Sequence, residues 1–136
     1  MATTKPQPVN PLQVKQFLAD ARKKAAAARK NLSIDEETAH QTAYESILRA
    51  SLALMLSRGQ RPRVQLGHHV AIMEFAQKHL DPALAPSFDL FDRMRRKRHI
   101  AFYDIAVISE VEAEEAVQAA ENYLKVVAAD IQTRIP

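Results

Sequence analysis

The sequence of 136 residues contains no cysteine and only two glycines, Gly59 and Gly67. The lack of cysteine excludes disulfide bonds, thiolate catalysis and zinc sites built from cysteine. The scarcity of glycine argues against a β-rich fold and leaves no glycine-rich loop to hold the phosphates of a nucleotide. The longest apolar run lies within Leu52–Leu56, too short to span a bilayer, and the opening residues lack the apolar segment of a secretory signal. We therefore expect a cytoplasmic protein.

Apolar residues make up 47% of the chain, enough for one packed core. They recur every three or four positions, which predicts helices. We expect an all-α fold, an up-and-down antiparallel bundle of four long helices plus a shorter fifth. The first ten residues have no such period, and we predict a flexible arm at 1–10 followed by a single domain at 11–136. The expected helices cover about 11–31, 34–58, 64–79, 87–102 and 109–131.

Local signals place the helix starts. Ser33 to Glu36 and Ser109 to Glu112 have the spacing of capping boxes, in which a serine and a glutamate satisfy each other's backbone N–H groups. Ser87 is a suitable N-cap for the fourth helix. Tyr44 and Tyr123 lie near apolar stripes, so we predict core positions with their hydroxyls at the rim.

Basic residues are concentrated late in the fourth predicted helix. Five cations occupy the six positions 93–98, here named the arginine segment: Arg93, Arg95, Arg96, Lys97 and Arg98. Like charges at this density repel one another, so we expect a compensating anion. One candidate is a phosphate chain. The other is a set of surface ion pairs with acids of the last helix, drawn from Glu110, Glu112, Glu114 and Glu115.

The helix order and the arginine segment resemble those of the HEPN superfamily, small helical-bundle domains of toxin–antitoxin and defence systems. Members have an arginine, a polar residue, a short spacer and a histidine at the end of a late helix. In many members this motif cleaves RNA, with two copies brought together across a homodimer. Arg98 matches the motif arginine, His99 matches the polar residue, and Tyr103 stands where the histidine is expected. A second register pairs Arg93 with His99 and puts Met94 at the polar position.

The resemblance implies phosphate binding more strongly than catalysis. Cleavage through the 2′-hydroxyl needs one group to take a proton and another to give one, and histidine suits both roles near neutral pH. Tyrosine, with a pKa near 10, is a poor base at that pH. The predicted catalytic residues are Arg98, His99 and Tyr103. The predicted phosphate-binding residues are Arg93, Arg95, Arg96 and Lys97, with no cofactor.

The histidines give no metal site. His68 and His69 are adjacent, so on a helix their side chains point about 100° apart and do not easily chelate one ion. We predict ordinary packing or surface roles for them, with a place in a pocket beside the fourth helix as the alternative.

Three functional hypotheses remain open on these observations. The first is a HEPN-like, RNA-binding homodimer that acts as a metal-independent endoribonuclease. The second is a catalytically silent HEPN module whose partner is a protein such as a small nucleotidyltransferase. The third is a structural bundle whose basic segment pairs with acids within the dimer.

Overall fold

The computed structural model describes residues 4–63, 68–103 and 107–136, and only the backbone of residues 68 and 101–103. This part of the chain folds into five helices: α1 (Pro11–Asn31), α2 (Glu36–Ser57), α3 (His68–His79), α4 (Ala85–Tyr103) and α5 (Glu110–Gln132). A 3-10 turn, η1 (Pro82–Leu84), precedes α4, and two short strands, β1 (Thr4–Pro6) and β2 (Gln60–Pro62), form a ribbon. The predicted all-α class is confirmed, and α3 is the short helix. None of the described helices is long and apolar enough to cross a membrane.

Helices α1 and α2 approach closely because small residues line their shared surface. The buried face of α1 consists largely of alanines, among them Ala21, Ala25 and Ala28. Helix α2 also buries several small residues, among them Ala43 and Ala50, and its buried Ser46 donates a hydrogen bond of 2.7 Å to the Ala21 carbonyl. Such short side chains allow ridges and grooves of two helices to interlock at small axial separation.

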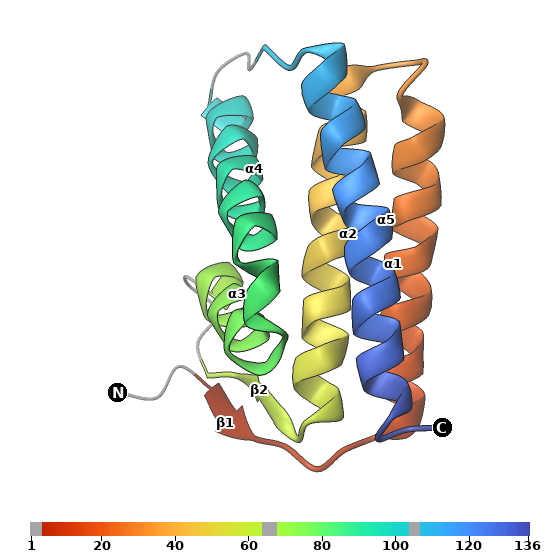
Figure 1. Ribbon diagram of the computed structural model, residues 1–136, viewed down its shortest axis with the longest axis vertical. Helices are drawn as coiled ribbons and strands as arrows, with labels where there is room; N and C mark the ends of the chain where they lie inside the picture. Colours follow the sequence, from red (N-terminus) through yellow and green to blue (C-terminus); the bar gives the residue numbers. More distant parts are fainter. Residues whose placement is uncertain (1–3, 64–67, 104–106) are drawn as a thin grey trace.

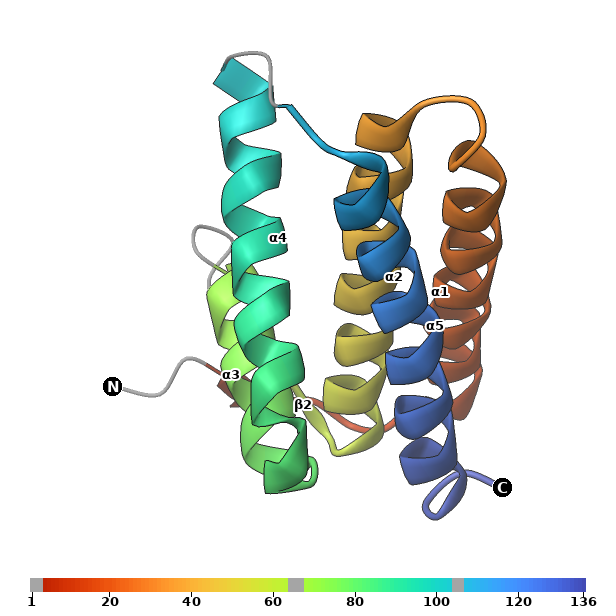
Figure 2. The same ribbon diagram turned by 45° about the horizontal axis from the view of Figure 1, so that its top comes forward.

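Helix α2 occupies the centre of the fold, with α1 and α5 on one side and the α3–α4 pair on the other (Figures 1 and 2). The aromatic part of the core lies where α4 meets α5. Phe91 contacts the Tyr123 ring edge-on with centroids 4.9 Å apart, and Phe88 contacts Phe91 in the same way at 5.4 Å. The Tyr123 hydroxyl lies 2.6 Å from Ser51 Oγ, so this buried phenol has a hydrogen-bond partner on α2.

Of the three serines predicted as N-caps, two are wrong and one is confirmed. Helix α2 is capped by Asp35, which accepts a hydrogen bond from the Glu37 N–H, whereas Ser33 lies in the preceding turn. Helix α4 begins two residues before Ser87, because η1 leads directly into it. The capping box of Ser109 and Glu112 opens α5 as predicted.

The segment predicted as a flexible arm contains a strand. Thr4–Pro6 pair antiparallel with Gln60–Pro62, and the Gln7 N–H donates to the Gly59 carbonyl at 2.9 Å. Gly59 has a φ of 73°, the left-handed conformation that ends α2 and turns the next residues alongside the arm.

Candidate functional site

The inward face of α4 changes from apolar to basic along its length. Phe88, Phe91 and Met94 are buried in the core. Arg95 and Arg98 follow at spacings of three and four residues, so helical geometry directs them toward the same side. Both are only partly exposed. Near the C-terminal end of α4, the apolar core side chains are therefore followed by the charged side chains of Arg95 and Arg98.

The Arg98 side chain extends from α4 to α2. Its Nη2 donates to Glu45 Oε1 over a long 3.4 Å, and the side chains of Arg98 and Glu45 are 39% and 40% exposed. The guanidinium carbon lies 5.8 Å from the centroid of the Tyr44 ring, within the range of a cation–π interaction. Arg98 is therefore held by one long ion pair and one ring contact.

Tyr44 lies fully buried beneath Arg98. Its hydroxyl is buried and has no hydrogen-bond partner among the described residues. The predicted position of the hydroxyl at the rim is therefore wrong for Tyr44, as it is for Tyr123, whose hydroxyl is also buried. The His69 ring lies on another side, with centroids 6.0 Å apart, so the alternative that a histidine of α3 joins this region is supported for His69. Burial raises the pKa of Tyr44 to about 12, while the nearby positive charges of Arg95 and Arg98 act in the opposite direction. The phenol is accordingly neutral near pH 7 and able to donate a hydrogen bond.

Asp92 neutralises the middle of the arginine segment. Its Oδ1 accepts hydrogen bonds from Arg95 Nη2 at 2.9 Å and Nε at 3.2 Å, and its Oδ2 accepts from Arg96. The hydrogen bonds from Arg96 and then Arg95 lower the pKa of Asp92. Asp92 was not among the acids predicted to compensate the segment, although it precedes Arg95 and Arg96 by three and four residues, the spacings that pair on a helix.

Lys97 joins α4 to the start of α5. Its Nζ lies 2.9 Å from Glu112 Oε2, and hydrogen bonding to Lys97 is the foremost cause of the lowered pKa of Glu112. Of the four acids proposed as partners for the segment, Glu112 is the one that pairs with it among the described residues. His40, buried on α2, is electrostatically coupled to this pair. Its pKa is lowered by burial first and by Lys97 as well, against the opposing effect of Glu112.

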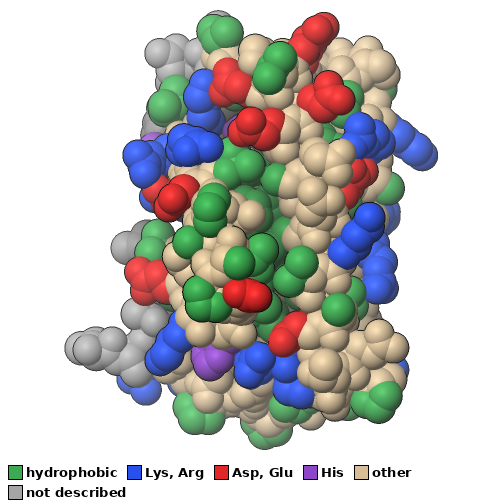
Figure 3. Space-filling model, in the orientation of Figure 1, with side chains coloured by type: hydrophobic (Ala, Val, Ile, Leu, Met, Phe, Trp, Pro, Cys, Tyr) green, Lys and Arg blue, Asp and Glu red, His purple; other side chains and the backbone are tan. Residues whose placement is uncertain are grey.

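The arginine segment is compensated only in part. Its five cations meet three carboxylates, those of Glu45, Asp92 and Glu112, and Asp92 is shared by two arginines. Arg93 is exposed and forms no ion pair within the described ranges. Among the described residues, two positive charges of the segment therefore have no carboxylate to balance them. Figure 3, in which α4 is on the left, shows basic and acidic side chains side by side near its upper end.

The predicted catalytic residues are only partly described. Arg98 and His99 are consecutive on α4, and His99 is exposed. Tyr103 ends α4, and its side chain lies outside the described part of the chain. One position argues against the second register, which pairs Arg93 with His99. Met94, which that register puts at a polar position, is a buried core residue.

The groove next to Arg95 does not suit an anion. A cavity of about 250 Å³ between α3 and α4 has Arg95 in its wall together with the carboxylates of Glu74, Asp89 and Asp92. A second cavity of about 300 Å³ lies between α4 and α5 and has mainly apolar walls. An anion would therefore be attracted to the Arg98 and Arg93 sides of α4 rather than to these cavities. No group of three metal-binding side chains occurs in the residues for which the structure gives positions.

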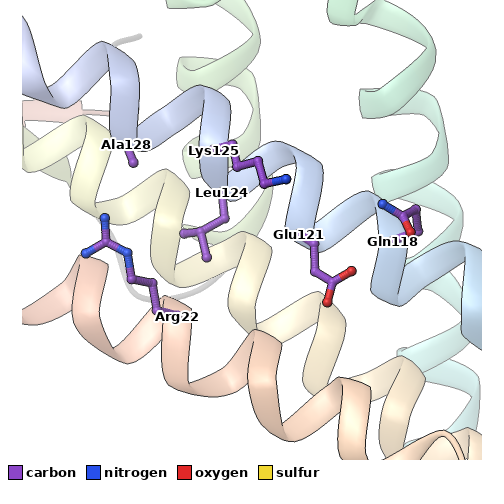
Figure 4. Close-up of a pocket in the computed structure, with 6 residues that line it drawn as sticks. All are labelled: Arg22, Gln118, Glu121, Leu124, Lys125 and Ala128. Carbon is purple, nitrogen blue, oxygen red and sulfur yellow. The ribbon is translucent and has the colours of Figure 1, made fainter.

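Basic residues also border a shallow cavity of about 440 Å³ between α1 and α5 (Figure 4). Figure 4 shows Arg22 on α1 and Lys125 and Glu121 on α5 along this cavity. Arg29 already donates two hydrogen bonds to Glu121, and this pairing is the first cause of the lowered pKa of Glu121. Charges arranged in this way are typical of a solvated helix surface.

Comparison with protein-family models and with curated proteins gives no match for this chain. Functional conclusions consequently rest on the geometry of the arginine segment and on the sequence resemblance.

Proposed function

We propose that this chain is a HEPN-like RNA-binding protein of the cytoplasm that contacts phosphates through the arginine segment of α4. The observation that supports the proposal is the excess of positive charge: in the described part of the chain, five cations share three carboxylates on one helix end. RNA offers a phosphate at every nucleotide, and basic side chains that neutralise phosphates release bound counterions. The proposal takes the four long helices as an antiparallel up-and-down bundle and the active form as a homodimer, with two α4 ends lining a shared cleft.

The existing ion pairs are weak enough to be exchanged for phosphate contacts. Pairs between exposed side chains contribute about 0–1 kcal/mol, and the pair of Arg98 with Glu45 is long and partly exposed. A guanidinium can instead bind a phosphate through two parallel hydrogen bonds, which is stronger than a single long contact. Arg93 forms no ion pair with a carboxylate of the described residues, so phosphate binding by Arg93 breaks none of the described ion pairs.

The proposal extends to metal-independent cleavage by the same helix end. Arg98 would stabilise the charge that develops on phosphorus, and His99, which is exposed beside it, would transfer protons. Tyr103 would orient the phosphate rather than act as a base, since an ordinary phenol keeps its proton near pH 7.

Binding of a fluorescent single-stranded RNA, measured by anisotropy over a series of salt concentrations, tests the proposal. Arg98→Ala is expected to weaken binding and to reduce the salt slope by about one. Arg22→Ala is the matched control, because it removes the same charge from the exposed face of α1. Equal effects of the two variants, or wild-type binding that does not respond to salt, would refute a phosphate site on α4. Incubation with RNA and EDTA, comparing wild type with His99→Ala and Arg98→Ala, tests cleavage.

A second candidate is the catalytically silent module that acts through a partner protein such as a small nucleotidyltransferase. The observation in its favour is that in-chain carboxylates already pair with four of the five cations. Mixing the chain with a candidate nucleotidyltransferase and measuring the mass of the eluted species by light scattering tests this function. A stable complex together with no salt-dependent RNA binding would favour it over the first.

A further inference from the structure

The Tyr44 hydroxyl lies within the electrostatic influence of two cations of α4. These are Arg95 and Arg98, whose guanidinium groups donate hydrogen bonds but do not accept them. The carboxylate of Asp92 also influences the phenol electrostatically, but its described hydrogen bonds come from Arg95 and Arg96, and none comes from Tyr44. The hydroxyl itself is buried and has no partner among the described residues. Buried polar groups without partners are rare in folded proteins.

Arg98 has donors to spare at the same place. Of its five N–H groups, the described contacts use one, directed at Glu45. An oxyanion seated between Arg98 and Tyr44 would accept hydrogen bonds from both, since a neutral phenol and a guanidinium are both donors. Glu45, the residue that follows Tyr44 on α2, presents its carboxylate to Arg98 as such an anion would.

We propose that Tyr44 is a second phosphate-binding residue beside Arg98, and that Glu45 occupies the position of the phosphate until RNA displaces it. This inference rests on the proposed RNA-binding function and identifies the residues of α2 that complete its phosphate site. The phenol becomes accessible when Arg98, which is 39% exposed, moves off the Tyr44 ring toward the ligand. The ligand class is a phosphodiester, recognised by one guanidinium and one hydroxyl.

Binding of the dinucleotide UpU, which contains a single phosphodiester, measures this site alone. Tyr44→Phe is expected to weaken UpU binding about tenfold, because it removes one hydrogen bond to a charged group. Glu45→Gln is expected to tighten binding several-fold, because a neutral amide competes less well for Arg98. Tyr123→Phe is the matched control, since its hydroxyl is equally buried but engaged with Ser51, and it should leave the affinity unchanged. Circular dichroism spectra of all variants report whether the fold is retained.

An NMR measurement observes the phenol directly. With tyrosine labelled at the ring carbon that bears the hydroxyl, addition of UpU should shift the Tyr44 resonance and leave that of Tyr123 in place. Loss of binding in Arg98→Ala, combined with wild-type affinity in Tyr44→Phe and no shift, would overturn this inference while the proposed function stands. Unchanged affinity in Arg98→Ala, or no UpU binding by the wild type, would overturn both.

Discussion

Tyr44 and Tyr123 are both buried tyrosines, and they lie in contrasting surroundings. Tyr123 packs against Phe88 and Phe91, and its hydroxyl has a partner in Ser51 at 2.6 Å. Tyr44 lies under Arg98 and near His69, and its hydroxyl has none among the described residues. The surroundings of Tyr123 bury its ring and pair its hydroxyl, as expected in a protein core. The surroundings of Tyr44 leave its hydroxyl unpaired among the described residues, next to excess positive charge. A buried polar group without a partner calls for an explanation, and a bound ligand is one such explanation.

The largest effect is expected in the aromatic region around Tyr123. Phe91→Ala should lower the free energy of unfolding by about 3–5 kcal/mol, because a fully buried ring is replaced by a cavity. Urea denaturation followed by circular dichroism measures the change. Arg93→Ala, on the exposed side of the same helix, serves as the control and should change stability by less than about 0.5 kcal/mol. Similar values for the two variants would mean that α4 is not part of the core.

The two tyrosine hydroxyls should differ in their effect on stability. Tyr123→Phe is expected to cost about 1 kcal/mol, because it removes a hydrogen bond made in the core. Tyr44→Phe removes no hydrogen bond described in the structure and should be neutral or slightly stabilising. Urea denaturation followed by circular dichroism compares the stabilities of the two variants. A greater loss for Tyr44→Phe than for Tyr123→Phe would show that the Tyr44 hydroxyl has a partner within the fold.

Acid should weaken the charged end of the bundle through His40. Burial lowers the pKa of His40 in the folded state, so the unfolded chain binds the proton more readily. Its contribution to stability is full above the unfolded pKa of about 6.5 and is lost as the pH falls below that value. The free energy of unfolding of the wild type should decrease from about pH 7.5 to about pH 5.5. The free energy of unfolding of His40→Gln should decrease less over the same range.

His79 provides the comparison for this pH dependence. Its pKa is also lowered, by burial first and by neighbouring cations, but its side chain is more exposed than that of His40. His79→Gln should therefore remove a smaller part of the pH dependence. The pKa values of Asp92 and Glu112 are lowered from values already near 4, so these carboxylates lose their contribution only in stronger acid. Identical pH profiles of stability for the wild type and His40→Gln would contradict the assignment of the pH dependence to His40.

The smallest effect is expected at Arg96. Its side chain is 66% exposed and pairs with Asp92, which also holds Arg95. Arg96→Ala should change the free energy of unfolding by less than about 0.5 kcal/mol, and added salt should reduce the difference. A loss of more than about 1 kcal/mol in the free energy of unfolding would mean that the ion pair of Arg96 with Asp92 stabilises the fold more than an ordinary surface pair does.

The helices were predictable because apolar residues recur at helical spacing along the chain, and α1 has the predicted bounds. The start of α2 was misplaced because Ser33 and Asp35 are both good N-caps, and the turn between the helices decides between them. The position of the cations on α4 was likewise evident in the sequence. The partner of Arg98 was not, since Glu45 is 53 residues away and their meeting depends on how α2 and α4 align. A buried, unpaired hydroxyl at Tyr44 also has no signature in the sequence, because its burial comes from α3 and α4 together.

The pairing of β1 with β2 gives the first residues an influence on a distant part of the chain. Thr4–Pro6 are hydrogen-bonded to the segment that leads from α2 toward α3, and α3 supplies His69 to the surroundings of Tyr44. Proteolytic removal of these residues would leave all five helices intact while lowering the free energy needed to open that connection locally. Trimming of the N-terminus is thus a means of loosening α3 without altering any residue of the bundle.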